Sequence, residues 1–297
     1  MLLGIIYFFI GLVLLYYGSD WFVVGGEKTA KFFNVSNFVI GATVIAFGTS
    51  VPEIVSSVYA ALTKSSGIAV GNAIGSCVCN IGLILAISSI VYPIIIKKDQ
   101  IKNILFHLFF VALTFILGVD GYNCVDGAIL FLTFIFYIIW VLKNDKIEKK
   151  KEEEEINIVI SLIFLIIGLI SVLIGAKLFI DGAKMIAFLL HIPDYIIGFS
   201  LVAFGTSVPE LMVSIAAAKR RLGGMILGNI IGSNIADIGG ALAISSFFSY
   251  LPTANIQMVI LLIMSILLYI FAKKSKITRF DGLILLILYI FAIKFLF

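Results

Sequence analysis

AFGTSVPE occurs twice in this chain, at Ala46–Glu53 and again at Ala203–Glu210. Each copy places a glutamate, a proline and two hydroxyl side chains inside a run of apolar residues. When the sequence is shifted by 157 residues, Gly41–Gly82 aligns with Gly198–Gly239 without a gap, and 20 of the 42 positions are identical. An internal repeat of this length governs the architecture of the chain.

Composition indicates the solvent for which the chain is built. Of its 297 residues, 62% are hydrophobic and only 13% are charged, whereas about a quarter of the residues in a soluble domain are charged. We therefore expect an integral membrane protein. The net charge of +4 gives no indication of a nucleic-acid partner, because the basic residues lie in short loops between apolar segments.

Cysteine and histidine are too scarce to indicate a site. Three cysteines do not form a disulfide framework. Cys77 and Cys79 lack histidine partners, so we interpret them as small packing residues rather than metal ligands. The two histidines, His107 and His191, lie far apart in the sequence and indicate no site.

Ten segments are apolar and, at about 20 residues, long enough to cross a bilayer. They cover residues 3–26, 37–62, 68–92, 101–119, 125–142, 157–180, 194–218, 225–250, 254–272 and 280–297. The loops after spans 1, 3, 5, 7 and 9 hold 17 of the 21 Lys and Arg residues. Since basic loops stay in the cytoplasm, we predict a multi-pass protein of the cell membrane with both termini extracellular.

The repeat gives each half five spans, and an odd number forces the second copy to enter the membrane from the opposite face. We predict an all-α membrane protein of ten transmembrane helices. Two inverted five-helix repeats would cover residues 1–142 and 157–297, with a short cytoplasmic linker at 143–156. Inverted repeats are typical of secondary transporters, which bind substrate near the midplane between the halves.

Each repeat also contains signals for broken helices. Pro52 and Pro209 each remove one backbone donor, which leaves the carbonyls of Gly48 and Gly205 unpaired. We predict broken helices in spans 2, 3, 7 and 8. Such backbone is tolerated at membrane depth where protein or a wet cavity covers it.

A second polar segment follows in each half, GNAIGSCVCN at Gly71–Asn80 and GNIIGSNIAD at Gly228–Asp237. In each segment a serine and a polar residue four positions later share one helix face. These pairs are Ser76 with Asn80, and Ser233 with Asp237. Inverted symmetry predicts that both pairs meet beside the two glutamates, whereas Asn72 and Asn229 either ligate or bridge helices.

The predicted site has three carboxylates, from Glu53, Glu210 and Asp237, and no Lys or Arg in these four segments. Each membrane-buried charge costs about 2.5–3.5 kcal/mol, so cations or protons must neutralise them. Carboxylate-rich oxygen coordination favours hard ions such as Ca²⁺. The neutral oxygens around Thr49 and Thr206 suit Na⁺.

Spans 1 and 6 carry glycines every seven residues, at Gly4, Gly11, Gly18 and Gly25 and at Gly168, Gly175 and Gly182. Such stripes let helices approach closely. Two interpretations stay open, namely static packing or a smooth surface on which the two helices slide over the core. Asp20 and Lys177 occupy equivalent positions in the repeats, and either pair with each other or face the membrane interface.

These motifs resemble those of a known family. Two copies of G-[TS]-S-x-P-E, each followed by G-N-x-x-G-S-[NC]-x-x-[ND], resemble the alpha repeats of the cation/calcium antiporters. The ten-span chain with its short central loop is similar to the archaeal sodium/calcium exchangers, and the resemblance covers essentially the whole chain. It implies a core of spans 2, 3, 7 and 8, with spans 1 and 6 as a mobile gate, and a cluster of four cation sites.

The resemblance also implies ligands for each site. The Ca²⁺ site would use the carboxylates of Glu53 and Glu210 with the backbone carbonyls of Thr49 and Thr206. The inner Na⁺ site would use Ala46, Thr49, Ser50, Ser76 and Glu53. The outer Na⁺ site would use Ala203, Thr206, Ser207, Ser233 and Glu210. The middle position would be lined by Glu53, Asn80, Glu210 and Asp237, with a water beside a protonated Asp237 when Na⁺ fills the other sites.

We therefore expect a Na⁺/Ca²⁺ antiporter in the lipid bilayer, which is not an enzyme, has no cofactor and implies no protein partner. The thirteen loop residues Lys143–Glu155 cannot form the regulatory Ca²⁺-binding domain of the eukaryotic exchangers. Four alternatives stay open: an H⁺/Ca²⁺ exchanger, a K⁺-dependent Na⁺/Ca²⁺ exchanger, a cation channel and an intramembrane protease. In the K⁺-dependent branch the resemblance implies an acidic residue at the position of Asn80, which is an amide here.

Overall fold

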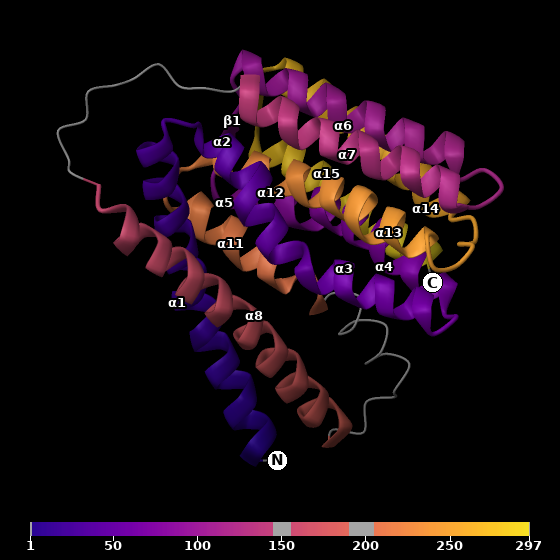
Figure 1. Cartoon of the computed structure of the whole chain (residues 1–297). Helices are drawn as coiled ribbons and strands as arrows, with labels where there is room; N and C mark the ends of the chain where they lie inside the picture. The colour runs from indigo at the N-terminus through magenta and orange to yellow at the C-terminus, as the bar shows by residue number, and fades with distance from the viewer. Residues whose placement is uncertain (1, 145–155, 190–204, 297) are drawn as a thin grey trace.

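Helices form nearly all of the described part of the chain, which is residues 2–144, 156–189 and 205–296 of this computed structural model (Figure 1). The first half contains α1 (Leu2–Phe33), α2 (Asn37–Ile40), α3 (Ala46–Leu62), α4 (Ser66–Cys79), α5 (Ala86–Val91), α6 (Lys98–Leu117) and α7 (Cys124–Asn144). The second half contains α8 (Ile158–Leu189), α11 (Val208–Lys219), α12 (Gly223–Ala236), α13 (Ala243–Ser246), α14 (Asn255–Lys273) and α15 (Arg279–Leu296).

Eight helical runs among the described residues are long and apolar enough to cross a membrane, so the prediction of a helical membrane protein is confirmed. They are Leu3–Phe33, Asn37–Leu62, Ser66–Val91, Lys98–Leu117, Cys124–Asn144, Ile158–Ile186, Gly223–Ser246 and Asn255–Lys273. Each overlaps one predicted span. Of the other two predicted spans, 194–218 lies partly outside the described residues and ends in α11, and 280–297 corresponds to α15.

Span 8 lies at the centre of the bundle. Every residue in the most apolar window of Gly223–Ser246 is buried, whereas the windows of α1 and α7 are only 28% buried. Small residues allow this central position. A Cβ atom on Gly228 would come within 2.3 Å of the carbonyl oxygen of Phe38, and one on Gly232 within 2.6 Å of the backbone of Ala42. The backbone of α12 therefore packs directly on the first part of span 2.

Within the described residues, three π-helical segments interrupt the regular helices. They are η1 (Gly41–Ile45), η2 (Asn80–Leu85) and η4 (Asp237–Leu242). They lie in spans 2, 3 and 8, and α11 of span 7 begins after a turn at Thr206 and Ser207. One prediction was wrong in its detail, because α3 runs through Pro52 without interruption. A proline costs a helix one hydrogen bond and one carbonyl clash, which this packed helix accommodates, so the irregular backbone of span 2 precedes the octapeptide.

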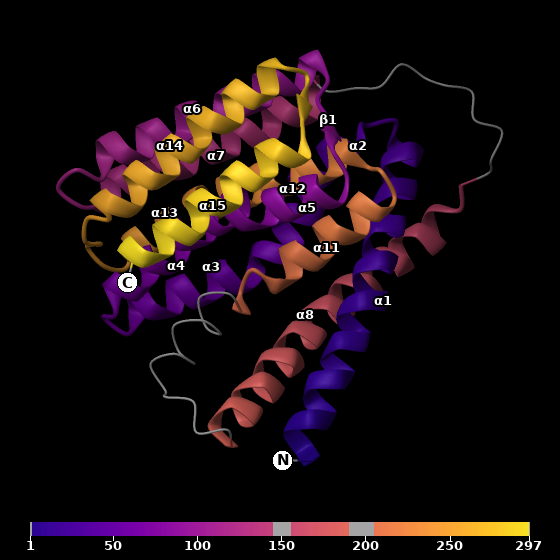
Figure 2. The same ribbon diagram turned by 180° about the vertical axis from the view of Figure 1, so that it is seen from behind.

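The long helices α1 and α8 lie side by side and are inclined across one edge of the other helices (Figure 1 and Figure 2). Their glycines meet the backbone of the partner helix. A Cβ atom on Gly168 would lie 2.4 Å from the amide nitrogen of Phe22, and one on Gly11 would lie 2.4 Å from that of Phe179. The glycine stripes therefore join α1 to α8 and do not form a sliding surface against the core.

Asp20 of α1 pairs with Arg220 at the end of α11, and not with Lys177. Arg220 donates from Nε to Oδ1 of Asp20 at 2.8 Å and from Nη2 to Oδ2 at 2.9 Å. The geometry is that of a two-point guanidinium–carboxylate contact. The pair fixes α1 beside the second repeat, a contact that the repeat register alone does not indicate.

The loops after spans 3 and 9 contact each other, and the loop after span 8 contacts the loops after spans 2 and 4. The two-residue strands β1 (Ile94–Ile95) and β2 (Lys276–Ile277) pair antiparallel after spans 3 and 9. Tyr122 forms a bridge with Leu251, which joins the loops after spans 4 and 8. Ser66 Oγ lies 2.8 Å from Ser249 Oγ, between the turns after spans 2 and 8.

We predict that Gly168→Ala destabilises the protein, because the added methyl group would meet the backbone of α1 at Phe22. Overpacking of this kind costs about 1–3 kcal/mol, which thermal denaturation in detergent would detect. Gly67→Ala is the matched control, because nothing lies within 4 Å of a Cβ atom there. Equal stability of the two variants would contradict the backbone contact between α1 and α8.

Candidate functional site

The glutamates of the two octapeptides reach one buried site. Glu53 on α3 and Glu210 on α11 are each only 1% exposed. Ser50 Oγ donates to Oε1 of Glu210 at 3.5 Å, which joins the first copy to the second. The side chain of Thr49 also lies close to Glu210, and that of Thr206 lies close to Glu53. Each octapeptide therefore contributes hydroxyl groups to the carboxylate of the other.

Asn80 and Asp237, the last positions of the two polar segments, also meet. Asn80 is the first residue of η2 and Asp237 the first of η4. Both are 1% exposed, and Nδ2 of Asn80 donates to Oδ2 of Asp237 at 3.4 Å. The negative charges of Glu53 and Glu210 both lie near that of Asp237. The ends of the two polar segments therefore meet beside the glutamates, as the sequence predicts.

Several buried oxygen atoms of the predicted ligands lack a hydrogen-bond partner among the described residues. They are Oε1 and Oε2 of Glu53, Oε2 of Glu210, Oδ1 of Asp237, Oδ1 of Asn80, Oγ of Ser207 and Oγ of Ser233. None of the ion pairs between described residues involves the three carboxylates. Burying polar atoms without partners is costly, so this donor set fits a hard cation that oxygen ligands prefer.

Carboxylates alone do not make the site. Among the described residues, no three His, Cys, Asp or Glu side chains cluster closely enough to hold a metal ion. A cation here would therefore need hydroxyl, amide and backbone oxygens beside one or two carboxylates. That mixture matches the neutral oxygens that the sequence places next to each glutamate.

Most of the remaining predicted ligands are buried, and one of them is not described. Ala46, Ser50, Ser76, Ser207 and Ser233 are buried, and Thr206 is partly exposed. Thr49 is fully buried, and its hydroxyl donates to the carbonyl oxygens of Ile45 and Ala46, both at 3.2 Å. Ala203 lies outside the described residues.

Asn72 and Asn229 both bridge helices through their amide nitrogens, which is one of the two interpretations of these residues. Nδ2 of Asn72 donates to the backbone carbonyl of Glu53 at 3.1 Å and to Ser57 Oγ at 2.9 Å. Nδ2 of Asn229 makes the equivalent contacts, to the carbonyl of Glu210 at 3.5 Å and to Ser214 Oγ at 3.0 Å. Each amide therefore fixes the backbone that carries one glutamate.

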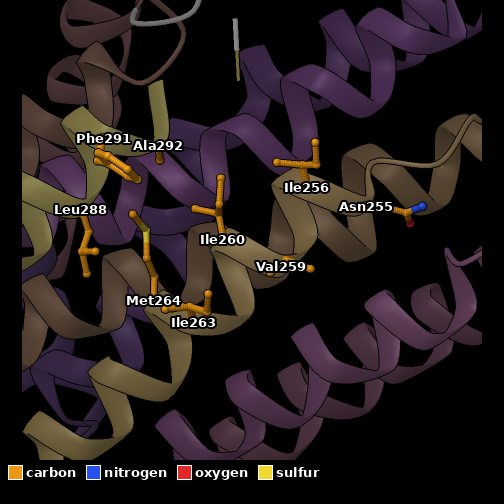
Figure 3. Close-up of a pocket in the computed structure, with 9 residues that line it drawn as sticks. All are labelled: Asn255, Ile256, Val259, Ile260, Ile263, Met264, Leu288, Phe291 and Ala292. Atoms are coloured by element: carbon orange, nitrogen blue, oxygen red, sulfur yellow. The ribbon is translucent and has the colours of Figure 1, made fainter. Parts of the chain in front are cut away.

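Two cavities differ in their relation to the site. One of about 430 Å³ lies between α3, α8 and the start of α11, and Thr206, Lys177 and Asp181 are among its lining residues. The other, of about 440 Å³, lies between α14 and α15 (Figure 3). Apart from Asn255 its lining is apolar, and no predicted ligand contributes to it. Only the first cavity reaches the candidate site.

Comparison with known proteins identifies the family. The model of the sodium/calcium exchanger protein family matches residues 3–143 and 160–297. The chain belongs to the sodium/calcium exchanger family. This family lies in the cation/calcium antiporter superfamily, as the resemblance implied, and its members are membrane transporters and not enzymes. The protease alternative is therefore excluded.

Individual relatives match this exchanger-family chain over almost its full length. The uncharacterized membrane protein MJ0091 of Methanocaldococcus jannaschii is 60% identical over 99% of this chain and 98% of that protein. The sodium/calcium exchanger MaX1 of Methanosarcina acetivorans is 31% identical over 95% of each chain. A structure of the sodium-calcium exchanger NCX_Mj soaked with Na⁺ and Sr²⁺ has a TM-score of 0.93 and 60% identity, over 99% of this chain and 98% of its own.

The sequence-based prediction did not include two residues at the edge of this exchanger-family site. Asn234 is buried, and its Oδ1 accepts from Nδ2 of Asn80 at 3.0 Å. His107 of α6 is also buried, and its Nε2 lies 3.0 Å from Nδ2 of Asn234. Asn234 lies within the quoted polar segment, although its repeat equivalent is Cys77. His107 carries no motif that could have revealed it.

We predict that Asn229→Ala lowers stability more than the repeat-equivalent Asn72→Ala. Each change leaves a fully buried serine hydroxyl without its amide, that of Ser214 or that of Ser57, and an unsatisfied buried group costs about 1–3 kcal/mol. Asn229 is itself fully buried. Asn72 is partly exposed, so water can replace part of its contacts. Thermal denaturation of both variants in detergent provides the measurement, and the reverse order would contradict the role of Asn229 as a buried brace.

Proposed function

We propose that this chain exchanges Na⁺ for Ca²⁺ across the cell membrane as a secondary antiporter. The observation that carries the proposal is the pair of buried glutamates, Glu53 and Glu210, whose carboxylate oxygens include several without a partner. Membership of the sodium/calcium exchanger family and the likeness to MaX1 and NCX_Mj support the choice of ions. Na⁺ and Ca²⁺ need the same glutamates, so they compete for them.

The proposed ligands are those that the family resemblance implies. Ca²⁺ binds the carboxylates of Glu53 and Glu210 and the carbonyls of Thr49 and Thr206. Inner Na⁺ binds Ala46, Thr49, Ser50, Ser76 and Glu53. Outer Na⁺ binds Ala203, Thr206, Ser207, Ser233 and Glu210. Glu53, Asn80, Glu210 and Asp237 line the middle position, where Asp237 carries H⁺ when Na⁺ fills the other sites.

The proposed architecture has ten spans in two inverted repeats, residues 1–142 and 157–297, joined by the cytoplasmic linker 143–156. Contacts of two equivalent turns support inversion. Ser66, after span 2, contacts the loop after span 8, whereas the position of a Cβ atom on Gly223, after span 7, lies 3.4 Å from Ile94, in the loop after span 3. The turn after span 2 thus contacts a loop that follows an even-numbered span, whereas the equivalent turn after span 7 contacts a loop that follows an odd-numbered span.

The proposed transport cycle is alternating access, with α1 and α8 moving as one gate. Their glycine contacts hold the two helices together, which favours movement as a unit. The cavity beside α8 gives one route to Thr206. Coupling follows from charge, because an empty site with three carboxylates is costly to carry through a dry barrier, so the gate moves only around a loaded site.

We predict that Glu53→Gln and Glu210→Gln each abolish Na⁺-driven Ca²⁺ uptake into proteoliposomes. Loss of an outer partner alone costs roughly 10–100-fold in metal affinity, and loss of a direct ligand costs more. Glu27→Gln is the control, because Glu27 lies on α1 beside Lys31 and outside the site. Near-normal uptake by either site variant would overturn the assignment.

Separate ion gradients test the coupling ion in the same vesicles. Under the proposal an imposed Na⁺ gradient drives Ca²⁺ uptake, and a pH or K⁺ gradient alone does not. Uptake driven by pH would instead identify an H⁺/Ca²⁺ exchanger, and a K⁺ requirement would identify the K⁺-dependent branch. Ca²⁺ current that needs no counter-ion would identify a channel.

We predict that Cys124 reacts with a membrane-impermeant maleimide added outside intact cells. Cys124 is exposed at the start of α7, on the side proposed to be extracellular, whereas Cys77 and Cys79 are buried. Cys124→Ser should therefore remove all labelling, which makes it the control. Labelling only after the cells are permeabilised would reverse the proposed orientation of the termini.

A further inference from the structure

His107 joins the cation site from outside the four spans that form it. It lies on α6 and is fully buried. A chain of three contacts runs from His107 Nε2 to Asn234 Nδ2 at 3.0 Å, from Asn234 Oδ1 to Asn80 Nδ2 at 3.0 Å, and from Asn80 Nδ2 to Asp237 Oδ2 at 3.4 Å. The four side chains that make these contacts are each at most 1% exposed, so solvent does not orient them.

The direction of each hydrogen bond follows from the amide of Asn80. Nδ2 of Asn80 donates both to Oδ2 of Asp237 and to Oδ1 of Asn234. Oδ2 of Asp237 accepts this bond whether the carboxyl group is ionised or carries its proton on Oδ1. Asn234 then accepts through Oδ1 and turns its own NH₂ group toward His107. His107 must accept at Nε2, which makes it a neutral imidazole with its proton on Nδ1.

The same order fixes the free atom of Asn80. With both contacts made by Nδ2, Oδ1 of Asn80 is buried without a partner among the described residues. That oxygen is the one available to a cation. If Asn234 were reversed, its NH₂ group would face Asn80, and Asn80 would have to turn its oxygen away from the site.

We propose that His107 is a positioning residue for cation binding, acting through Asn234 to hold Oδ1 of Asn80 toward the middle position. This inference rests on the proposed function. It concerns one half of the molecule only, because the repeat equivalent of Asn234 is Cys77, whose thiol donates to the backbone carbonyl of Asn234 at 3.6 Å. The first repeat therefore has no amide side chain at the position equivalent to Asn234. His107 orients Asn234, a function that no residue of the repeated motif provides.

The test measures half-saturating Ca²⁺ and Na⁺ concentrations and maximal exchange rates of purified variants in proteoliposomes. His107→Leu removes the acceptor, whereas His107→Gln restores an acceptor at about the position of Nε2. Phe110→Leu is the matched control, because Phe110 is equally buried one turn along α6. Asn80→Ala, alone and combined with His107→Leu, completes a double-mutant cycle.

We expect His107→Leu to raise at least one half-saturating concentration roughly tenfold, the scale typical of outer partners of metal ligands. The maximal rate should change little, and His107→Gln and Phe110→Leu should behave like the unchanged protein. In the Asn80→Ala background, His107→Leu should have no further effect. Should His107→Leu not yield folded protein, Asn234→Leu cuts the same relay from its other end.

Unchanged affinities in His107→Leu, or an equal effect with and without Asn80, would overturn the inference. A loss of maximal rate that His107→Gln does not rescue would make His107 a packing residue, which also overturns it. The Glu53→Gln measurement separates these outcomes from failure of the proposed function. If Glu53→Gln abolishes exchange while His107→Leu changes neither affinity nor rate, the exchanger assignment stands and only the proposed role of His107 is wrong.

Discussion

Everything in this structure is arranged around negative charge that the protein itself does not neutralise. Glu53, Glu210 and Asp237 are buried in the bundle, and no basic side chain among the described residues pairs with them. Charge inside a membrane protein is costly and is retained mainly where it serves a function. Neutralisation must therefore come from outside, as protons or metal ions, and a protein that depends on exchangeable counter-ions already has the basic requirement of an ion carrier.

This requirement explains why two halves are needed. Neither octapeptide surrounds its own glutamate, since Ser50 of the first half contacts Glu210 of the second and Thr206 of the second lies beside Glu53 of the first. The site exists only while the halves are docked, and the glycines of α12 allow that docking by direct backbone contact with span 2. The amides of Asn72 and Asn229 then fix each glutamate's backbone from within its own half.

Repetition made the main features predictable from the sequence. The apolar composition predicted a membrane protein. The duplicated motifs identified both glutamates together with Asn80 and Asp237, because two copies of a polar motif in apolar surroundings are hard to explain by packing. What escaped prediction depends on tertiary contact. The glycine stripes of α1 and α8 could face either the core or each other, Asp20 could reach several partners, and Pro52 gave no sign that its helix would continue. His107 escaped because a single buried histidine has no pattern.

The two repeats differ at one pair of equivalent positions beside the glutamates. At the equivalent positions 80 and 237 the chain places an amide and an acid, which contact each other at 3.4 Å. A second acid there would add a fourth charge that one Ca²⁺ could not balance. Under the proposed function the two glutamates balance Ca²⁺, and Asp237 is left to a proton and to the amide of Asn80. That amide can serve both the acid and a cation only if its orientation is fixed, which is why the contacts of Asn234 matter to the ion.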